Sequence, residues 1–192
     1  MTAASSHSLL ALASILALSL AGCSDGGTAP ADDAAVVMDD AATNDTNDPF
    51  ATPSMCSSRV RWFLGDHGSL LMHPGRACIA CHTSMARGPV LTLAGTVYPS
   101  AHEPDDCYGA DGLNSVEEMH IIVTDAHGAV QDVLANQAGN FYSQTPVVFP
   151  ITAVVSYQGH TRAMTTPSPS GDCNSCHTES GIIGAPGRIM LP

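Results

Sequence analysis

The chain has 192 residues and a formal net charge of −12, and only 5% of its residues are aromatic. Its six basic residues are all arginines, whereas binding to nucleic-acid phosphates requires clustered lysine or arginine. We therefore expect no nucleic-acid partner. From residue 55 on, eleven acidic residues face six arginines, a formal charge of −5. Such a charge either steers a basic protein partner or only keeps the chain in solution.

The first 22 residues are similar to a bacterial export signal. Residues 9–21 (LLALASILALSLA) form an apolar run of signal-peptide length that is too short to span a membrane. Residues 20–23 (LAGC) resemble the lipobox of bacterial lipoproteins, in which the cysteine is acylated and becomes the mature N-terminus. We expect residues 1–22 to be a lipoprotein signal peptide and Cys23 to be the lipidation site. The signal departs from the usual pattern in that residues 1–8 lack lysine and arginine. The alternative is ordinary secretion with cleavage near Ala21 and a free Cys23.

Residues 23–54 are rich in Asp, Ala, Thr, Asn, Gly and Pro and contain almost nothing to bury. This composition predicts a disordered acidic tether that lets an anchored domain reach away from a membrane. The next segment, residues 55–90, begins with MCSSRVRWFL at 55–64. The apolar spacing there predicts a short helix with Val60, Phe63 and Leu64 on one side.

Residues 91–165 carry short runs of β-forming residues separated by glycine and asparagine turns. These runs are residues 90–98, 119–124, 130–135, 141–142, 147–157 and 161–164. Short strands at close intervals predict a mainly β fold, a small antiparallel β-sandwich. Short helical or loop segments flank it, residues 55–90 before and 166–192 after. We expect the strand aromatics to be core residues, namely Phe141, Tyr142, Phe149 and Tyr157.

Two C-x-x-C-H motifs occur in these flanking segments, at residues 78–82 (CIACH) and 173–177 (CNSCH). Two thiols three residues apart lie on one side of a helical turn, where they can add to the two vinyl groups of one haem. The following histidine is then carried under the porphyrin to bind iron, so the motif predicts c-type haem attachment. Two covalently bound haem c groups are expected. Their thioether cysteines would be Cys78, Cys81, Cys173 and Cys176, and their proximal iron ligands His82 and His177.

The four motif cysteines could instead bind zinc, form a redox-active dithiol or form local disulfides. Two C-x-x-C pairs could bind one structural zinc ion, but zinc gives no reason for a histidine after each pair. A thioredoxin-like dithiol calls for a βαβ context, which the pattern lacks. A disulfide within each pair would be strained. The two remaining cysteines, Cys56 and Cys107, are expected to form a disulfide in an oxidising compartment, with two free thiols as the alternative.

The sixth iron ligands are expected among the remaining histidines and methionines, because histidine or methionine fills this position in electron-transfer haems. The leading candidate is His102, in a polar loop just past a strand. Met164 is second, at a strand end nine residues before Cys173. Met72 and His73 lie close to Cys78 in sequence, and we do not expect them to cross the haem plane. The other candidates are His67, His120, His127, His160, Met85 and Met190.

Several stretches resemble a known family. They are MHPGRACIACH (72–82), AGTVYP (94–99), GNFY (139–142), SGDCNSCH (170–177) and GAPGR (184–188). Together they resemble short c-type cytochrome lipoproteins of proteobacteria in which a carboxypeptidase-regulatory-like (transthyretin-like) β-sandwich separates two haem motifs. The resemblance implies electron transfer and no known substrate, and it leaves the sixth ligands open.

Three functions follow from these expectations. The first is an electron carrier, not an enzyme, at the bacterial cell envelope. It would be lipid-anchored on the periplasmic or outer-surface side and exchange electrons with redox partner proteins. The second is a di-haem peroxidase-like enzyme, which needs one open iron position and distal acid–base groups. The third is a binding module in which the β-sandwich recognises a partner and the haems act as sensors or structural staples.

Overall fold

The computed structural model describes residues 56–86, 88–113 and 118–192. The expected signal peptide (residues 1–22), the tether (23–54) and the lipidation site Cys23 lie outside the described residues. Within the described part of the chain, no helix has both the length and the apolar character needed to cross a bilayer.

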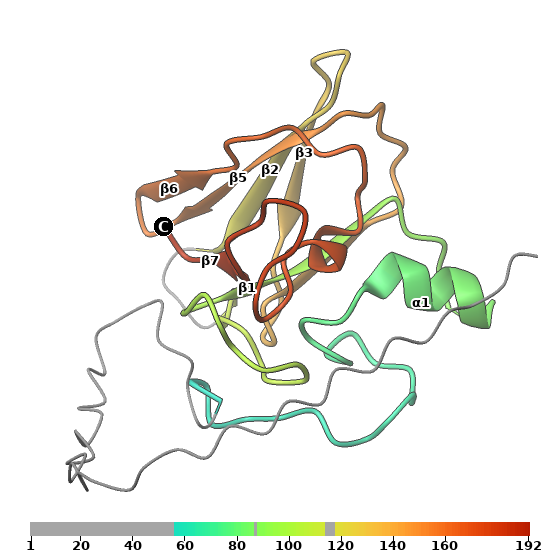
Figure 1. The fold of residues 1–192 in the computed structure, drawn as a ribbon, viewed down its shortest axis with the longest axis vertical. Coiled ribbons are helices and arrows are strands. Elements are labelled where there is room, and N and C mark those ends of the chain that lie inside the picture. The colour runs from blue at the N-terminus through green and yellow to red at the C-terminus, as the bar shows by residue number, and fades with distance from the viewer. Residues whose placement is uncertain (1–55, 87, 114–117) are drawn as a thin grey trace, which may run out of the picture. The chain divides into compact units, whose positions relative to one another are not determined.

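The fold is mainly β, as the strand pattern predicts, with two sheets and one short helix (Figure 1). One sheet has three strands in the order β4-β1-β7, and the other has four strands in the order β3-β2-β5-β6. The strands are β1 (Leu93–Tyr98), β2 (His120–Thr124), β3 (Val130–Leu134), β4 (Asn140–Ser143), β5 (Thr152–Tyr157), β6 (His160–Ala163) and β7 (Ile189–Met190). The helices are α1 (Cys78–Met85) and the 3-10 turn η1 (Cys173–Ser175). All strand pairs are antiparallel except β1 with β7.

Both sheets contribute side chains to one hydrophobic core. In β2, alternate residues Ile121 and Val123 are buried, as expected for a strand with one face on the core. Ile121 pairs with Val155 of β5, and its neighbours in the core include Leu93 of β1 and Phe141 of β4. Burial of such apolar side chains is the main favourable term in holding the two sheets together.

Strand β1 connects this core to the segments that carry the two motifs. All six of its residues are buried. Leu93 and Val97 belong to the core, whereas the alternate residues Thr96 and Tyr98 bond to the motif-bearing segments and to the loop after β1. Because side chains alternate along a strand, β1 presents one face to the four-stranded sheet and the other to those segments. In Figure 1 the C-terminal segment, in dark orange to red, crosses over β1 toward α1.

The helix expected at residues 55–64 is wrong within the described residues. Residues 56–64 form turns and an isolated bridge between Arg61 and Cys107, and Val60, Phe63 and Leu64 are exposed. Backbone pairing with a distant loop replaces helical hydrogen bonds, since the Trp62 N–H donates to the Asp106 carbonyl at 2.7 Å. Tertiary contacts commonly override so weak a local preference.

The expected aromatic core is correct only in part. Phe141 is buried at 2% exposure and Tyr157 is half-buried, but Tyr142 and Phe149 are about 40% exposed. Tyr142 follows Phe141 on β4, so its side chain points to the opposite face of the strand. Phe149 lies before β5, ahead of a cis peptide bond to Pro150, and is not part of a strand.

Candidate haem-binding site

The first motif lies on α1, which places Cys78 and Cys81 on one side of a helical turn. The Nδ1 atom of His82 lies 3.0 Å from the carbonyl oxygen of Pro89, in the loop after the helix. A carbonyl only accepts, so Nδ1 must donate, and this tautomer leaves Nε2 free to bind a metal. Gly88 makes the close approach feasible: its φ is +80°, and a Cβ there would lie 3.0 Å from Cε1 of His82.

A cavity of about 570 Å³ opens beside α1. Its walls are α1 and the loop after it, residues 66–72, and parts of β1 and β4. Cys78, Cys81 and His82 all line it, and most of the remaining lining is apolar, including Leu70 and Phe141. Its volume lies in the range of about 300–1,000 Å³ typical of small-molecule and cofactor sites. The residues present therefore fit a porphyrin attached to the motif cysteines.

The second motif begins on η1 and places its histidine in the same way. The Nδ1 atom of His177 lies 2.8 Å from the carbonyl oxygen of Gly187, so Nε2 is again free. Burial lowers the pKa of His177, which favours the neutral imidazole that metal ligation needs. Both motif histidines thus have the tautomer required of an iron ligand.

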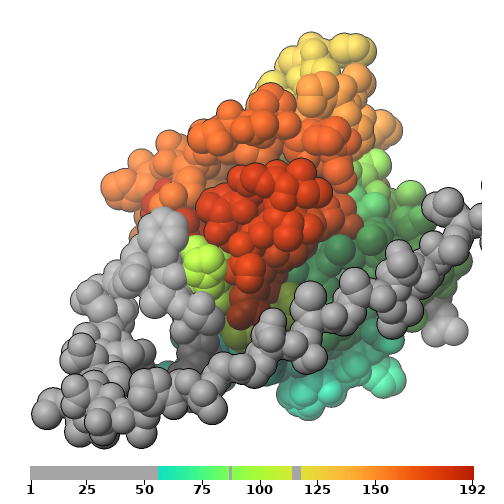
Figure 2. Space-filling model, in the orientation of Figure 1, coloured from blue at the N-terminus to red at the C-terminus, as the bar shows by residue number. Residues whose placement is uncertain are grey.

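The two motifs are packed directly against each other (Figure 2), where the red C-terminal segment lies beside the green segment that includes α1. Asp172, just before the second motif, accepts a hydrogen bond from the Ala80 N–H at 2.8 Å, in the first turn of α1. Asn174, inside the second motif and 2% exposed, donates to the Arg76 carbonyl at 3.0 Å and accepts from the Thr96 N–H at 3.0 Å. The spacing between the motifs is therefore fixed by buried polar contacts.

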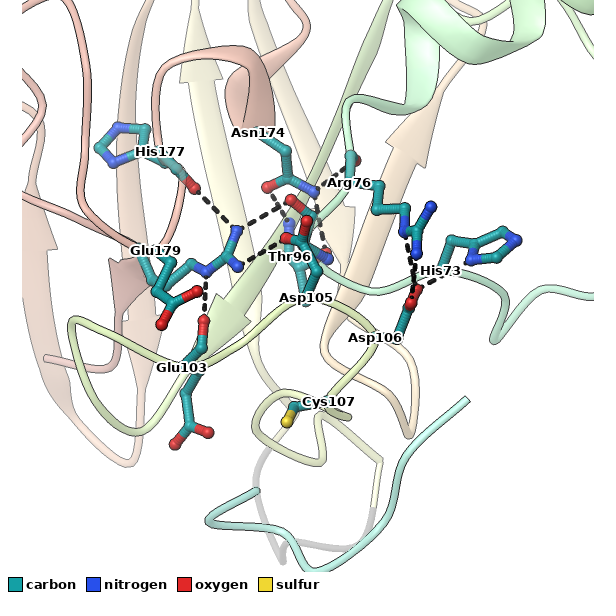
Figure 3. A network of polar contacts seen from close by, with 12 residues as sticks. His73, Arg76, Thr96, Glu103, Asp105, Asp106, Cys107, Asn174, His177 and Glu179 are labelled. Carbon is teal, nitrogen blue, oxygen red and sulfur yellow. Dashed lines mark hydrogen bonds and ion pairs between the residues drawn. The ribbon is translucent and has the colours of Figure 1, made fainter. Parts of the chain in front are cut away.

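Arg188 joins these segments to the loop after β1. Figure 3 shows residues of this polar network, among them Glu103, Asp105 and His177. The fully buried guanidinium of Arg188 donates to the carbonyls of Glu103 at 2.8 Å and Gly75 at 2.9 Å, and to the Asp105 carboxylate at 2.7 Å. It also lies 3.4 Å from the carbonyl of His177. One side chain thus links the segment before the first motif with the histidine of the second motif.

The thiols of Cys78 and Cys173 are not poised for redox exchange. Burial, followed by the nearby charge of Asp172, raises the pKa of Cys78 and of Cys173 to about 12. Reactive dithiols instead have lowered pKa values, because the thiolate is the nucleophile. All four motif cysteines are free, and within the described residues no three His, Cys, Asp or Glu side chains converge to hold a metal ion. The geometry thus offers no support for the zinc and thioredoxin-like alternatives.

The structure pairs Cys56 with Cys107 in a disulfide, the pairing expected from the sequence. It ties the start of the described chain to the loop that follows β1. That loop also carries Asp105, which is bound by Arg188, and Asp106, which is bound by Arg76 at 2.6 Å. The disulfide therefore constrains the loop after β1, which carries His102 and contacts the segments that hold both motifs.

Of the two candidate sixth ligands, the structure brings His102 to a motif. Its Nδ1 atom lies 2.6 Å from the carbonyl of Glu179, two residues past His177, and a Cβ on Gly187 would lie 3.3 Å from its Cε1. The Nε2 atom of His102 is therefore free beside the second motif, as are the Nε2 atoms of the motif histidines His82 and His177. Met164 follows β6, where its N–H donates to the Ala153 carbonyl at 2.8 Å. Within the described residues, no hydrogen bond or cavity wall joins Met164 to either motif.

Two other histidines have ring nitrogens that bind carboxylates. His73 binds Asp106 through Nδ1 at 2.8 Å and Asp66 through Nε2 at 3.1 Å, so neither nitrogen is free. The Nδ1 atom of His120 lies 2.8 Å from the Asp132 carboxylate, on the four-stranded sheet. By contrast, Met72 lines the cavity of the first motif, although we did not expect it to cross the haem plane, because it lies close to Cys78 in sequence.

Sequence reasoning missed the residues that hold the motifs together, namely Asp172, Asn174 and Arg188. The only available signals were a carboxylate immediately before the second motif and an arginine near the C-terminus of a chain that has just six arginines. Neither signal identifies a partner, because Ala80, which bonds to Asp172, and Asp105, which binds Arg188, lie more than 80 residues away from them in sequence.

No family model matches the chain, and no curated protein and no solved structure is similar to it.

Proposed function

We propose that the protein is an exported di-haem c-type cytochrome lipoprotein that transfers electrons at the bacterial cell envelope. The observation that supports this is the pair of C-x-x-C-H motifs whose histidines, His82 and His177, each donate Nδ1–H to a backbone carbonyl and keep Nε2 free. An arrangement that orients the ligand through its second nitrogen is typical of metal-binding histidines. Two copies in one small fold call for two metal-containing cofactors.

Bound haem supplies the one-electron chemistry, and the chain supplies attachment, orientation and shielding. The thiols of Cys78 and Cys81 anchor one group at the cavity beside α1, whose apolar walls keep water away. Cys173 and Cys176 anchor the other. Asp172 and Asn174 hold the two attachment sites at a fixed separation. A rigid framework of this kind suits electron exchange between two neighbouring centres.

The proposed location and partners come from the sequence. Acylation at Cys23 would place the folded part at the end of an acidic tether on a membrane of the cell envelope. The folded part itself carries an excess of acidic residues, which favours encounter with a basic redox protein. Phosphate-binding surfaces are not expected, so nucleic acid is excluded from the proposed partners.

The test is the mass and the haem content of the full chain produced in a host that matures c-type cytochromes. We expect two haems per polypeptide, retained after denaturation because they are covalent. Replacing Cys173 and Cys176 with alanine should reduce the count to one. The matched control replaces the disulfide pair Cys56 and Cys107 and should keep two haems. A polypeptide whose mass contains only amino acids and lipid refutes the proposal.

Carbon monoxide separates the electron carrier from a peroxidase-like enzyme. Reduced protein with both irons six-coordinate should not bind carbon monoxide, whereas an enzyme with an open iron position should bind it at one haem. Rapid peroxide turnover together with such binding would favour the enzyme.

A further inference from the structure

The cavity beside α1 contains a candidate ligand on a wall other than the helix. We propose that Met72 is the sixth ligand of the haem attached at Cys78 and Cys81, opposite His82. This inference rests on the proposed function, since it concerns the same haem. It assigns methionine to the first haem, whereas the second motif is approached by a histidine, His102.

A sixth ligand must come from the side of the cavity that lies opposite the helix of His82. Proximal and sixth ligands occupy opposite faces of a porphyrin, so a residue on the helix of the proximal histidine is poorly placed. Met85 is such a residue: it lies three positions after His82 on α1, and its Sδ is 3.5 Å from Sγ of Cys81. It therefore stays with the attachment side of the cavity.

The other walls offer two groups of the kinds that ligate haem iron, Met72 and Tyr142. Met72 is half-buried, whereas Tyr142 is 38% exposed and follows the core residue Phe141 on β4. A thioether on a protected wall can remain bound to iron without competition from water. The neighbouring His73 cannot serve, because both of its ring nitrogens are bound to carboxylates.

The segment that carries Met72 is held by the sheet and not by α1. The amide of Asn140, on β4, lies 3.3 Å from the Met72 carbonyl, and the amide of Asn136 lies 2.6 Å from the Leu70 carbonyl. Asn140 is itself buried and accepts a hydrogen bond from the Thr96 hydroxyl at 2.8 Å. Met72 is thus presented to the cavity by a rigid support that is separate from the helix of His82, as a pre-organised ligand requires.

This assignment makes the two haems unequal. Methionine–histidine ligation gives a higher reduction potential than ligation by two histidines. The first haem would therefore hold an electron more tightly than a second haem ligated by His177 and His102. An electron that enters at the second haem would therefore move to the first haem, beside α1, so electron transfer between the two haems would have a preferred direction.

The test uses the full chain carrying its haems, in wild-type form and as Met72→Ala, Met85→Ala and Met72→His. We expect the ferric wild type to show the long-wavelength charge-transfer band of methionine-ligated haem. Met72→Ala should lose this band and bind carbon monoxide at one of its two reduced haems, whereas Met85→Ala should keep the band. Met72→His should stay indifferent to carbon monoxide and lower one midpoint potential.

Haem content separates the failures. If no variant or wild-type chain carries covalent haem, the proposed function fails. If the wild type carries two haems but lacks the methionine band, or if Met72→Ala keeps two haems and an unchanged spectrum, the assignment of Met72 is overturned while the cytochrome remains. Loss of the band in Met85→Ala alone overturns it equally.

Discussion

The carboxylate of Asp172 accepts a hydrogen bond from the backbone N–H of Ala80 across 92 residues of sequence. Ala77, the N-cap residue of α1, offers no side-chain acceptor to the helix. The helix that carries the first motif is therefore capped by the residue that precedes the second, and neither motif can be displaced without disturbing the other.

Removing this cap should destabilise the fold. Asp172→Ala leaves the Ala80 N–H at the start of α1 without its acceptor, and loss of an N-cap costs about 0.5–2 kcal/mol. We expect the upper half of this range, because Asp172 is only 6% exposed and water cannot readily replace it. Chemical denaturation of the full chain measures the free energy of unfolding.

The control for this change is Asp132→Ala, which removes a carboxylate that is 55% exposed and bound only to His120. Exposed ion pairs of this kind contribute about 0–1 kcal/mol. Asp172→Asn keeps an oxygen acceptor and should retain most of the stability. Equal losses in Asp172→Ala and Asp132→Ala would contradict a capping role.

The acid sensitivity of the fold should depend on Asp106. Burial alone would raise its pKa, but hydrogen bonds from Arg76 and His73 outweigh burial and hold the pKa below its ordinary value. Because the folded pKa lies below the unfolded value of about 3.9, the carboxylate stabilises the fold above that pH. This contribution is lost as the pH falls through the folded pKa.

Asp106→Asn should therefore flatten the fall in unfolding free energy as the pH drops below about 4. Its stability at neutral pH should be lower than that of the wild type, since the three charge-assisted hydrogen bonds from Arg76 and His73 are weakened. Denaturation curves over this acid range give the slope directly. An unchanged slope in Asp106→Asn would show that other carboxylates govern the acid transition.

The strands were the most predictable part of the fold, and the motif contacts the least. Alternation of buried and half-buried residues marks β2 around Ile121 and Val123, and such a local pattern can be read directly. β7 has only two residues and exists because Ile189 pairs with Val97. A strand that depends wholly on its partner leaves no local pattern to detect.

The candidate site divides in the same way. C-x-x-C-H is local, so the sequence alone identifies Cys78, Cys81 and His82 as a unit. The cavity beside them is built by β4 and by residues 66–72, which come together only in the folded chain. The prediction of a helix at residues 55–64 was wrong because it used only local sequence. Pairing with the distant loop around Cys107 outweighs the weak amphipathic spacing of this segment.

Arg188 should be one of the most sensitive positions in the chain. Arg188→Ala removes a buried guanidinium and leaves the carbonyls of Glu103 and Gly75 without a donor. Each orphaned buried polar group costs about 1–3 kcal/mol, so the total loss should reach roughly 3 kcal/mol. Thermal unfolding measures it, and Arg162→Ala, an exposed arginine with one bond to the Leu191 carbonyl, is the control. Arg188→Lys should not restore stability, because an ammonium lacks the planar fork; full rescue by lysine would show that charge alone matters.

His102 should control the second haem. Its Nδ1 is held by the Glu179 carbonyl at 2.6 Å, which leaves Nε2 free beside the segment that follows His177. If it is the sixth ligand, His102→Ala should allow carbon monoxide to bind one reduced haem, and His102→Met should raise one midpoint potential because methionine ligation favours the reduced iron. His160→Ala, on the exposed edge strand β6, should change neither property. Combining His102→Ala with Met72→Ala should open both haems to carbon monoxide, so binding that stays at one haem in the double variant would mean that both residues act on the same iron.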